Sequence, residues 1–547
     1  MLKRDRRRRR LRRWSAGWAI FLAVLLAACT SQSGSTGSTA EMGETAGTGS
    51  GSGSGGELII AMTAGDVPTP DTYPTQGQEG LRFVGFQIYD ALTRWDLTQG
   101  DTLPKLVGGL ATEWEVSEDK LTWTFKLREG VTFHDGTPFN ADAVIFNLDR
   151  ILDQNFPYYN AQAAAGPRSQ TTVIAGYEKI DDYTVAITTH EPFSMLPENM
   201  AFVTFASPEA VKTYGDDYLE HPSGTGPFKF ERLVPGQELV MVRNENYWGG
   251  APKLDRLIVK PMPDASSRTA ALLAGEVHWA EAPSPEAVER LKSQGFNLIT
   301  NTYPHIWRSY LNQDLDVLKD VRVRQALNYA IDRETMAEAL LMGLGTPSTQ
   351  FWYEGHEFYH PDAVKYTYDP EKAKALLAEA GYPGGFSGRI VIPASGSGHM
   401  WPIPMTEYIQ QNLLAIGVDM KIDVMEWQTM LQNNRAGFPN DRDALGFAWG
   451  TPTHTLLSFY NTVHSSSPTN HGKYANPKVD ELLDQAYQTF DEAERNALIR
   501  EASRIATDEA AILFVVHDLN ARALAPNVKG FVQPQSWFAD LTTVWVE

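Results

Sequence analysis

One short segment of the sequence matches a zinc-protease motif, because His356-Glu357-Phe358-Tyr359-His360 has the H-E-x-x-H spacing. In a metallopeptidase this spacing sets two imidazole ligands on one face of a helix, with the glutamate as general base. Gly355 precedes the segment and Pro361 follows it, and both discourage a helix. Five residues between helix breakers do not supply the long helix that this chemistry needs. We therefore predict that the chain is not an enzyme, and a zinc metallopeptidase remains as the alternative from another class.

The remaining histidines, of 12 in the sequence, are scattered, so no cofactor and no metal site is predicted. Cys29 is the only cysteine among the 547 residues. One cysteine forms neither an intramolecular disulfide nor a thiolate metal cluster. The interest of Cys29 therefore lies in its surroundings.

The first 28 residues are typical of a secretory signal peptide. Residues 3–13 are basic, residues 18–26 are apolar, and small residues then lead to Cys29. The apolar run is too short for a spanning helix, which needs about 20 residues. Cys29 directly after Leu26-Ala27-Ala28 resembles the lipobox of bacterial lipoproteins. That resemblance implies cleavage before Cys29, lipid attachment to it, and a protein anchored to the membrane on its periplasmic or extracellular face.

Composition limits the possible partners. The formal net charge is −20 although the leader is strongly basic, so the rest of the chain is more acidic still. Such a chain offers no basic surface for nucleic acid or anionic lipid, and any link to a membrane must come from Cys29. The length exceeds what one hydrophobic core supports, which predicts at least two lobes.

The order of predicted elements indicates an α/β body. Residues 30–56 are rich in Ser, Thr and Gly and should form a flexible tether. Alternation or apolar runs predict strands at 121–127, 238–243, 256–261 and 512–516. Apolar periodicity and capping residues predict helices after Asn140, at 321–331, after Asp369, and at 406–416, 477–489 and 492–507.

Four sequence blocks, in order, carry a family resemblance. They are Leu106-Val107-Gly108-Gly109-Leu110 running on to His134-Asp135-Gly136, Gly224-Thr225-Gly226-Pro227-Phe228, residues 320–332, and Tyr368-Asp369-Pro370 with the residues up to Gly381. Together they resemble the extracellular solute-binding proteins of peptide/nickel-type (dipeptide/oligopeptide-binding) ABC importers. Arg322 and Arg324 in the third block are expected to form scaffold ion pairs rather than contacts with a ligand.

The resemblance implies a two-lobed, periplasmic-binding-protein-like fold with a ligand cleft between lobes joined by two hinge strands. The implied parts are a signal peptide at 1–28, a lipid-anchored linker at 29–56, lobe I at 57–304 with an extra subdomain near 93–222, lobe II at 305–514, and a return to lobe I at 515–547. It implies a monomer that captures a small solute and delivers it to an ABC permease with its ATPase subunits. The chain has no G-x-x-x-x-G-K-[ST] loop, so ATP hydrolysis must come from another polypeptide.

The solute is less well defined. Family members that bind free peptides hold the α-amino group with the Asp of a Trp-x-x-Asp segment, whereas this chain has Trp449-Gly450-Thr451-Pro452. Dipeptide binders also use an Arg before the helix at 406–416, and residues 395–402 contain none. A peptide or peptide-like solute without those two anchors is predicted, with an oligosaccharide as the alternative. The candidate binding residues are Trp401, His399, Trp449, Arg308 and Trp307.

Overall fold

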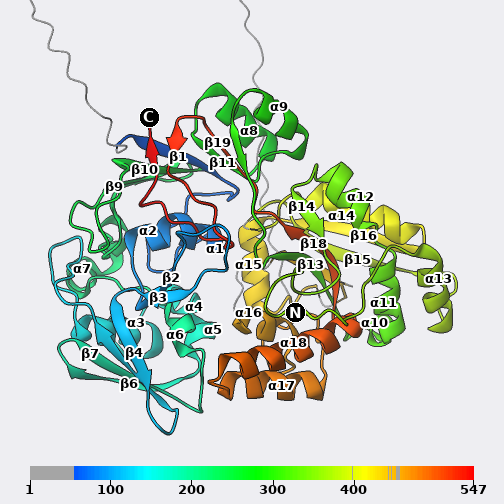
Figure 1. The fold of residues 1–547 in the computed structure, drawn as a ribbon, viewed down its shortest axis with the longest axis horizontal. Helices are drawn as coiled ribbons and strands as arrows, with labels where there is room; N and C mark the ends of the chain where they lie inside the picture. Colours follow the sequence, from blue (N-terminus) through cyan, green and yellow to red (C-terminus); the bar gives the residue numbers. More distant parts are fainter. Residues whose placement is uncertain (1–54, 397, 442, 445, 451–455) are drawn as a thin grey trace, which may run out of the picture. The chain divides into compact units, whose positions relative to one another are not determined.

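Two large β-sheets, each with its own helices, organise the protein (Figure 1). The computed structural model describes residues 55–396, 398–441, 443–444, 446–450 and 456–547, and for residues 447–450 it describes the backbone alone. These described residues belong to one structural unit. None of their helices has the length and apolar character needed to span a bilayer.

The first sheet has seven strands and is built around the N-terminal strand of the described chain. Its order is β12 (Asn297–Ile299), β19 (Arg522–Leu524), β11 (Trp279–Glu281), β1 (Glu57–Met62), β10 (Arg256–Pro261), β9 (Glu238–Arg243) and β8 (Phe228–Val234). Strand β1 runs parallel to both neighbours, β10 and β11. Its apolar side chains are buried except for the half-buried Ile59, as expected for a parallel strand covered on both faces.

The second sheet has six strands. Its order is β14 (Gly345–Pro347), β18 (Ile512–Asp518), β13 (Ile306–Leu311), β17 (Gly446–Gly450), β15 (Phe386–Pro393) and β16 (Val418–Met425). Every residue of β13 and β18 is buried, and the two strands pair antiparallel. The chain therefore enters and leaves this sheet through two adjacent central strands.

A third, four-stranded sheet follows the order β4 (Ala111–Val116), β5 (Thr122–Leu127), β7 (Thr184–Thr189) and β6 (Ile174–Asp181). Its Trp123 and Phe125 point into a core shared with helix α3 (Ala141–Leu152). The side chain of Asn140 caps α3 by accepting a hydrogen bond from the Ala143 N–H at 3.1 Å. Two short strand pairs complete the sheets, β2 (Thr93–Trp95) with β3 (Leu106–Gly108) and β20 (Val528–Lys529) with β21 (Trp545–Val546).

Five of the six predicted helices begin where predicted, after Asn140 and Asp369 and at residues 321, 477 and 492. The longer helices besides α3 are α7 (Pro208–Tyr214), α8 (Ala265–Ala274), α11 (Val321–Tyr329), α13 (Pro370–Glu379), α14 (Pro402–Leu414), α15 (Trp427–Ala436), α16 (Leu456–Val463), α17 (Pro477–Gln488) and α18 (Glu492–Asp508). Asp320 and Asp369 cap α11 and α13 with side-chain oxygens, which confirms those two starts. The predicted start of α14 at 406 was wrong, because Pro402 is compatible with the first turn of a helix and begins it.

Arg322 and Arg324 on α11 serve the scaffold. Arg322 pairs with Asp320 at 2.6 Å. Arg324 is buried and donates to four backbone carbonyls, including those of Leu318 at 2.8 Å and Glu509 at 2.9 Å. The predicted ion pair is therefore confirmed for Arg322 and wrong for Arg324, which serves the scaffold through carbonyl oxygens and has no ion pair among the described residues.

An aromatic junction joins the four-stranded sheet region to the α17–α18 pair. We use this name for Trp123, Phe193, Tyr487 and Phe490. The rings of Trp123 and Phe490 stack at 6.0 Å, and those of Phe193 and Tyr487 lie 4.8 Å apart. The Ser194 N–H donates to the Tyr487 carbonyl at 2.7 Å. This contact links segments that are almost 300 residues apart in the chain.

The chain passes between the two large sheets at two neighbouring crossings. One lies between β12 and β13, and the other between β18 and β19. The Asn301 N–H of the first crossing donates to the Leu519 carbonyl of the second at 2.8 Å. The two connections between the sheets are thus hydrogen-bonded side by side.

Candidate functional site

A hollow lies beside the crossing between β18 and β19, at the ends of strands from both large sheets. Thr63 follows β1, Glu281 ends β11 and Asp518 ends β18, while Trp401 precedes α14. The hollow measures about 500 Å³ when the open solvent at its mouth is included. Its lining also includes Ala282, Pro283, Pro285, Leu341, Leu344, Gly396, Gly398, Met400, Asn520, Ala521 and Trp537. Most of these groups are apolar, as is usual in sites for small molecules.

Asp518 is a buried carboxylate in the wall of the hollow, with a side chain that is 7% exposed. The Tyr303 hydroxyl donates to Oδ2 at 2.9 Å, and the Asn520 N–H donates to Oδ1. The ring Nδ1 of His305 lies 3.5 Å from Oδ2. Burial raises the pKa of Asp518 to about 6, because the charged form loses its hydration.

Glu281 is the second carboxylate of the lining, and its surroundings compensate its charge. Arg82 Nη2 lies 2.6 Å from Oε2, and Arg522 Nε lies 3.3 Å from Oε1. The Trp279 indole N–H also donates to Oε1 at 2.7 Å. These partners come from behind the wall, since none of the three belongs to the lining. Glu281 is therefore held in a fixed position by an internal network.

Trp537 brings an aromatic ring to the same wall. The Arg82 guanidinium lies 4.2 Å from the centre of a Trp537 ring, and the Arg522 guanidinium donates to the Trp537 carbonyl at 2.8 Å. The Asn520 side chain donates to the Ser536 carbonyl at 2.9 Å, which ties this segment to the crossing. Trp537 is thus fixed beside Asp518 by the same arginines that compensate Glu281.

The predicted binding residues occupy different places. Trp401 is half-buried and lines the hollow. His399 is buried beside the edge of the Trp427 ring at 5.0 Å, and burial lowers its pKa to about 3. Arg308 is also buried, and it donates to the Tyr310 hydroxyl at 3.0 Å and the Thr462 hydroxyl at 2.8 Å. Neither His399 nor Arg308 belongs to the lining.

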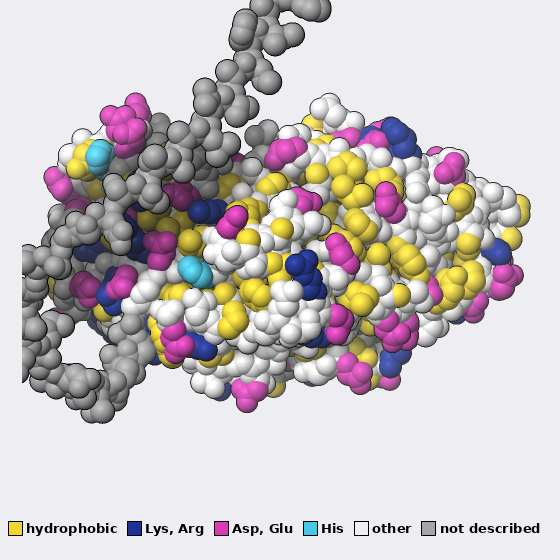
Figure 2. Space-filling view, turned by 90° about the horizontal axis from the view of Figure 1, so that it is seen from above, with side chains coloured by type: hydrophobic (Ala, Val, Ile, Leu, Met, Phe, Trp, Pro, Cys, Tyr) yellow, Lys and Arg dark blue, Asp and Glu magenta, His cyan; other side chains and the backbone are white. Residues whose placement is uncertain are grey.

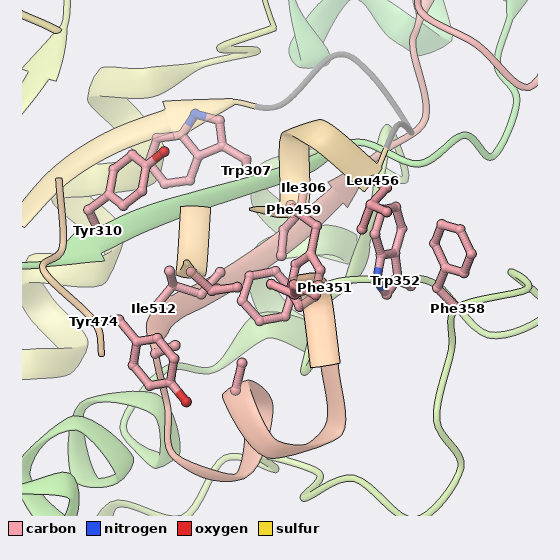
Figure 3. Close-up of a cluster of buried hydrophobic side chains, with 14 of the residues drawn as sticks. Ile306, Trp307, Tyr310, Phe351, Trp352, Phe358, Leu456, Phe459, Tyr474 and Ile512 are labelled. Carbon is pink, nitrogen blue, oxygen red and sulfur yellow. The ribbon is translucent and has the colours of Figure 1, made fainter. Parts of the chain in front are cut away.

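Trp307 has no exposed surface and belongs to the hydrophobic core. Figure 3 shows it in a cluster of buried side chains with Tyr310, Phe351 and Phe459. Trp449 lies on β17 with its Cα opposite that of Arg308, and its side chain is outside the described part. Residues 451–452 and Cys29 also lie outside the described residues. The ligand contacts assigned to these residues stay predictions.

The H-E-x-x-H segment does not have the geometry of a zinc peptidase. Residues 356–360 form turns and bends, and no helix places the two imidazoles on one face. The His356 ring stacks on Trp352 at 4.6 Å, and Glu357 accepts a hydrogen bond from Asn496 at 2.6 Å. Within the described ranges, no group of three or more His, Cys, Asp or Glu side chains could hold a metal ion.

The hollow also contains groups that the sequence reasoning missed. Asp518, Asn520 and Trp537 lie in it, and Glu281 ends a strand of only three residues. The available signal was the predicted buried strand at 512–516, because side chains at the ends of strands near a crossing are placed to meet a ligand. The residues that directly follow the predicted strand, Asp518 and Asn520 among them, therefore lie at the hollow, whereas Trp307 does not.

Comparison with known proteins defines the class of the chain. Residues 105–471 match the bacterial extracellular solute-binding proteins, family 5 (middle). Heme-binding protein A of Haemophilus influenzae is 32% identical over 473 residues, covering 82% of this chain and 84% of that protein. The dipeptide-binding protein of Escherichia coli is 30% identical over 470 residues, covering 81% of this chain and 86% of that protein.

Solved structures agree on the fold. A periplasmic binding protein from Helicobacter pylori in complex with the peptide STSA has a TM-score of 0.78 and 26% identity, covering 90% of this chain and 99% of the other. A dipeptide-binding protein from Pseudoalteromonas sp. SM9913 in complex with Met-Leu has a TM-score of 0.79 and 26% identity, covering 90% of this chain and 100% of the other.

The fold is therefore that of the two-lobed periplasmic binding proteins, with a mixed α/β architecture as predicted. The chain belongs to the family 5 bacterial extracellular solute-binding proteins. It is a solute-binding receptor of an ABC importer.

Proposed function

We propose that the hollow is the solute site and that the solute is a peptide or a peptide-like molecule. The single observation that carries this is the lining itself, which takes residues from strand ends of both large sheets and from the crossing after β18. A solute held there contacts both lobes at once, so its binding energy favours the arrangement in which the lobes are together. Two relatives with structures in complex with peptides, and a third named as a dipeptide-binding protein, support the class of solute.

An oligosaccharide is the second candidate on the same scaffold. The rings of Trp401 and Trp537 favour it, since aromatic faces bind sugars as well as apolar side chains. The hollow offers few hydroxyl or amide side chains besides Thr63 and Asn520, which weighs against a sugar with many hydroxyl groups. We therefore place the peptide first.

A thermal-shift screen of the full chain in detergent tests this choice. Peptides of two to nine residues, oligosaccharides and divalent metals are compared at equal concentration. A ligand that binds only the folded state raises the melting temperature by mass action. We expect the largest rise with peptides, and a rise with sugars alone would replace the peptide by an oligosaccharide. Turnover of any bound peptide would overturn the proposal that the chain is not an enzyme.

We also propose the division of the chain that the resemblance implies. Lobe I comprises 57–304 and the return at 515–547, lobe II comprises 305–514, and the extra subdomain lies near 93–222. The first crossing, at 300–305, supports the limit at 304/305, because β12 and β13 belong to different sheets. The second crossing, at 519–521, lies a few residues beyond the proposed limit at 514/515, since β18 pairs within the six-stranded sheet up to Asp518. Limited proteolysis with and without peptide tests them, and cuts at the crossings are expected to slow when solute is bound.

The membrane link is a further part of the proposal. Residues 1–28 act as the signal peptide, Cys29 carries lipid, and residues 29–56 tether the receptor to the outer face of the membrane beside its permease and ATPase subunits. Two or three acyl chains suffice for stable anchoring, whereas one is marginal. Mass spectrometry of the mature N-terminus tests this, and Cys29→Ala is expected to release the protein from the membrane. The receptor is proposed to act as a monomer.

No role with nucleic acid is proposed. Figure 2 shows acidic and basic side chains interspersed with apolar ones over the visible part of one face. Binding to a phosphate backbone depends on clustered basic side chains. The net charge of −20 also opposes it.

A further inference from the structure

The hollow is lined by charged groups of one sign. Glu281 and Asp518 are charged, and no Lys, Arg or His belongs to the described lining. Arg82 and Arg522 compensate Glu281, whereas Asp518 has no Lys or Arg within ion-pair distance in the described chain. The nearest basic group to Asp518 is His305, which is completely buried. Burial and the nearby His399, Arg308 and His517 lower the pKa of His305 well below its usual value, so its ring is neutral.

An ionised Asp518 is therefore a buried negative charge without a compensating cation. Such a charge is costly unless a partner of opposite sign reaches it. Its two present donors, the Tyr303 hydroxyl and the Asn520 N–H, occupy only part of the capacity of a carboxylate, which accepts about four hydrogen bonds. A positively charged group in the hollow would complete the coordination of Asp518.

Trp537 provides a second and independent observation. The side chain is 4% exposed, and its indole N–H has no hydrogen-bond partner among the described residues. A buried N–H of this kind normally finds an acceptor, and Trp537 lines the same hollow as Asp518. The wall thus combines a carboxylate, that of Asp518, without a paired Lys or Arg and an indole N–H, that of Trp537, without a hydrogen-bond acceptor among the described residues.

We infer that Asp518 and Trp537 form the subsite for the amino end of a peptide. Asp518 binds the protonated α-amine, and the Trp537 N–H donates to a nearby peptide carbonyl oxygen. The inference rests on the proposed function, because it requires a peptide in the hollow. It places the amine at the crossing after β18 and not at the Trp449–Pro452 segment, which lacks the Asp of peptide-binding relatives. An anionic end is disfavoured here, since two carboxylates would face it.

Competition between paired peptides tests the inference. The full chain in detergent is equilibrated with a mixture of random tripeptides and tetrapeptides and with the same mixture after N-acetylation, and bound peptides are quantified by mass spectrometry. Hydrogen bonds to charged groups contribute about 1.5–3 kcal/mol, so free-amine peptides should bind about 10- to 150-fold more tightly than acetylated ones. Asp518→Asn should reduce this preference to less than about threefold.

Three outcomes separate the inference from the function on which it rests. Loss of the amine preference in Asp518→Asn, with acetylated peptides retained as before, supports the subsite. Equal retention of both mixtures by the wild-type protein refutes the subsite and leaves peptide binding intact. Failure to retain either mixture refutes peptide binding and, with it, the subsite.

Asp316→Asn is the matched control, because it removes one carboxylate at a side chain that is 94% exposed and that pairs, within the described part of the chain, only with Lys319. It should keep the full amine preference. Trp537→Phe provides a second variant that keeps an aromatic ring beneath Arg82. It should weaken free and acetylated peptides by the same factor, since it removes only the donor to the carbonyl. A selective loss of free-amine peptides in Trp537→Phe would contradict the assignment.

Discussion

The aromatic junction allows a sharp test of lobe closure. Phe490 lies between α17 and α18, stacks on Trp123 at 6.0 Å, and has the ammonium of Lys120 5.1 Å from its ring centre. An aromatic pair contributes about 0.5–1.5 kcal/mol beyond burial, and an exposed cation–π contact about 0.5–1 kcal/mol. Phe490→Ala should therefore destabilise the arrangement in which these surfaces touch by about 1–2.5 kcal/mol.

This loss appears in the affinity for solute if the junction forms when the lobes come together on a ligand. The apparent Kd of Phe490→Ala should then rise by about 5- to 70-fold. Isothermal titration with the tightest peptide from the thermal-shift screen measures it. Phe386→Ala is the matched control, because Phe386 pairs with Tyr382 at 5.7 Å within the six-stranded sheet region. An affinity of Phe490→Ala within twofold of wild type would refute this reasoning.

Three further predictions concern buried ionisable side chains. Binding of free-amine peptides should weaken about tenfold between pH 7 and pH 5, because the pKa of Asp518 is about 6 and the protonated acid no longer attracts an ammonium. His517 and His399, with pKa values of about 4 and about 3, stay neutral in this range. The affinity of Asp518→Asn should therefore not change over the same pH range. Burial lowers the pKa of His517 from 6.5 to about 4, so the unfolded state binds a proton first and the free energy of unfolding falls as the pH falls from 6.5 to 4. His517→Gln should remove about 3 kcal/mol of that loss in urea titrations across this range. The control His190→Gln, at an exposed histidine, should not change it. Arg333→Lys should lower the free energy of unfolding by about 3 kcal/mol, because the guanidinium donates to the Phe514 and Asn328 carbonyls at 2.7 and 2.9 Å and a lysine leaves some of these acceptors unsatisfied. The surface change Arg322→Lys should cost less than about 1 kcal/mol. Equal urea midpoints for the two variants would contradict this account.

Local signals predicted much of the scaffold. Alternation and apolar runs gave strands β9 and β10 at their observed bounds, and Asp320 and Asp369 marked the starts of α11 and α13. These features depend on neighbours in sequence, so a single sequence suffices. The start of α14 was predicted too late, at 406, because Pro402 begins the helix and proline is accepted in the first turn.

The candidate site was predicted less well, for a physical reason. Whether Trp307 or Trp401 faces a solute depends on how two sheets meet, and both look alike in sequence. Asp518 follows a strand that was predicted, but its burial depends on Tyr303 and Asn520, which approach from different segments. Such long-range packing leaves no trace in local periodicity.

The position of Asp518 has a mechanical consequence. It begins one of two crossings, and its partner Tyr303 belongs to the other. A solute bound to this carboxylate would act near the axis of any relative rotation of the two large sheets. A small displacement near that axis becomes a larger displacement at the outer edges of the lobes. Binding at Asp518 would in this way change the outer surface of the receptor far from the solute itself.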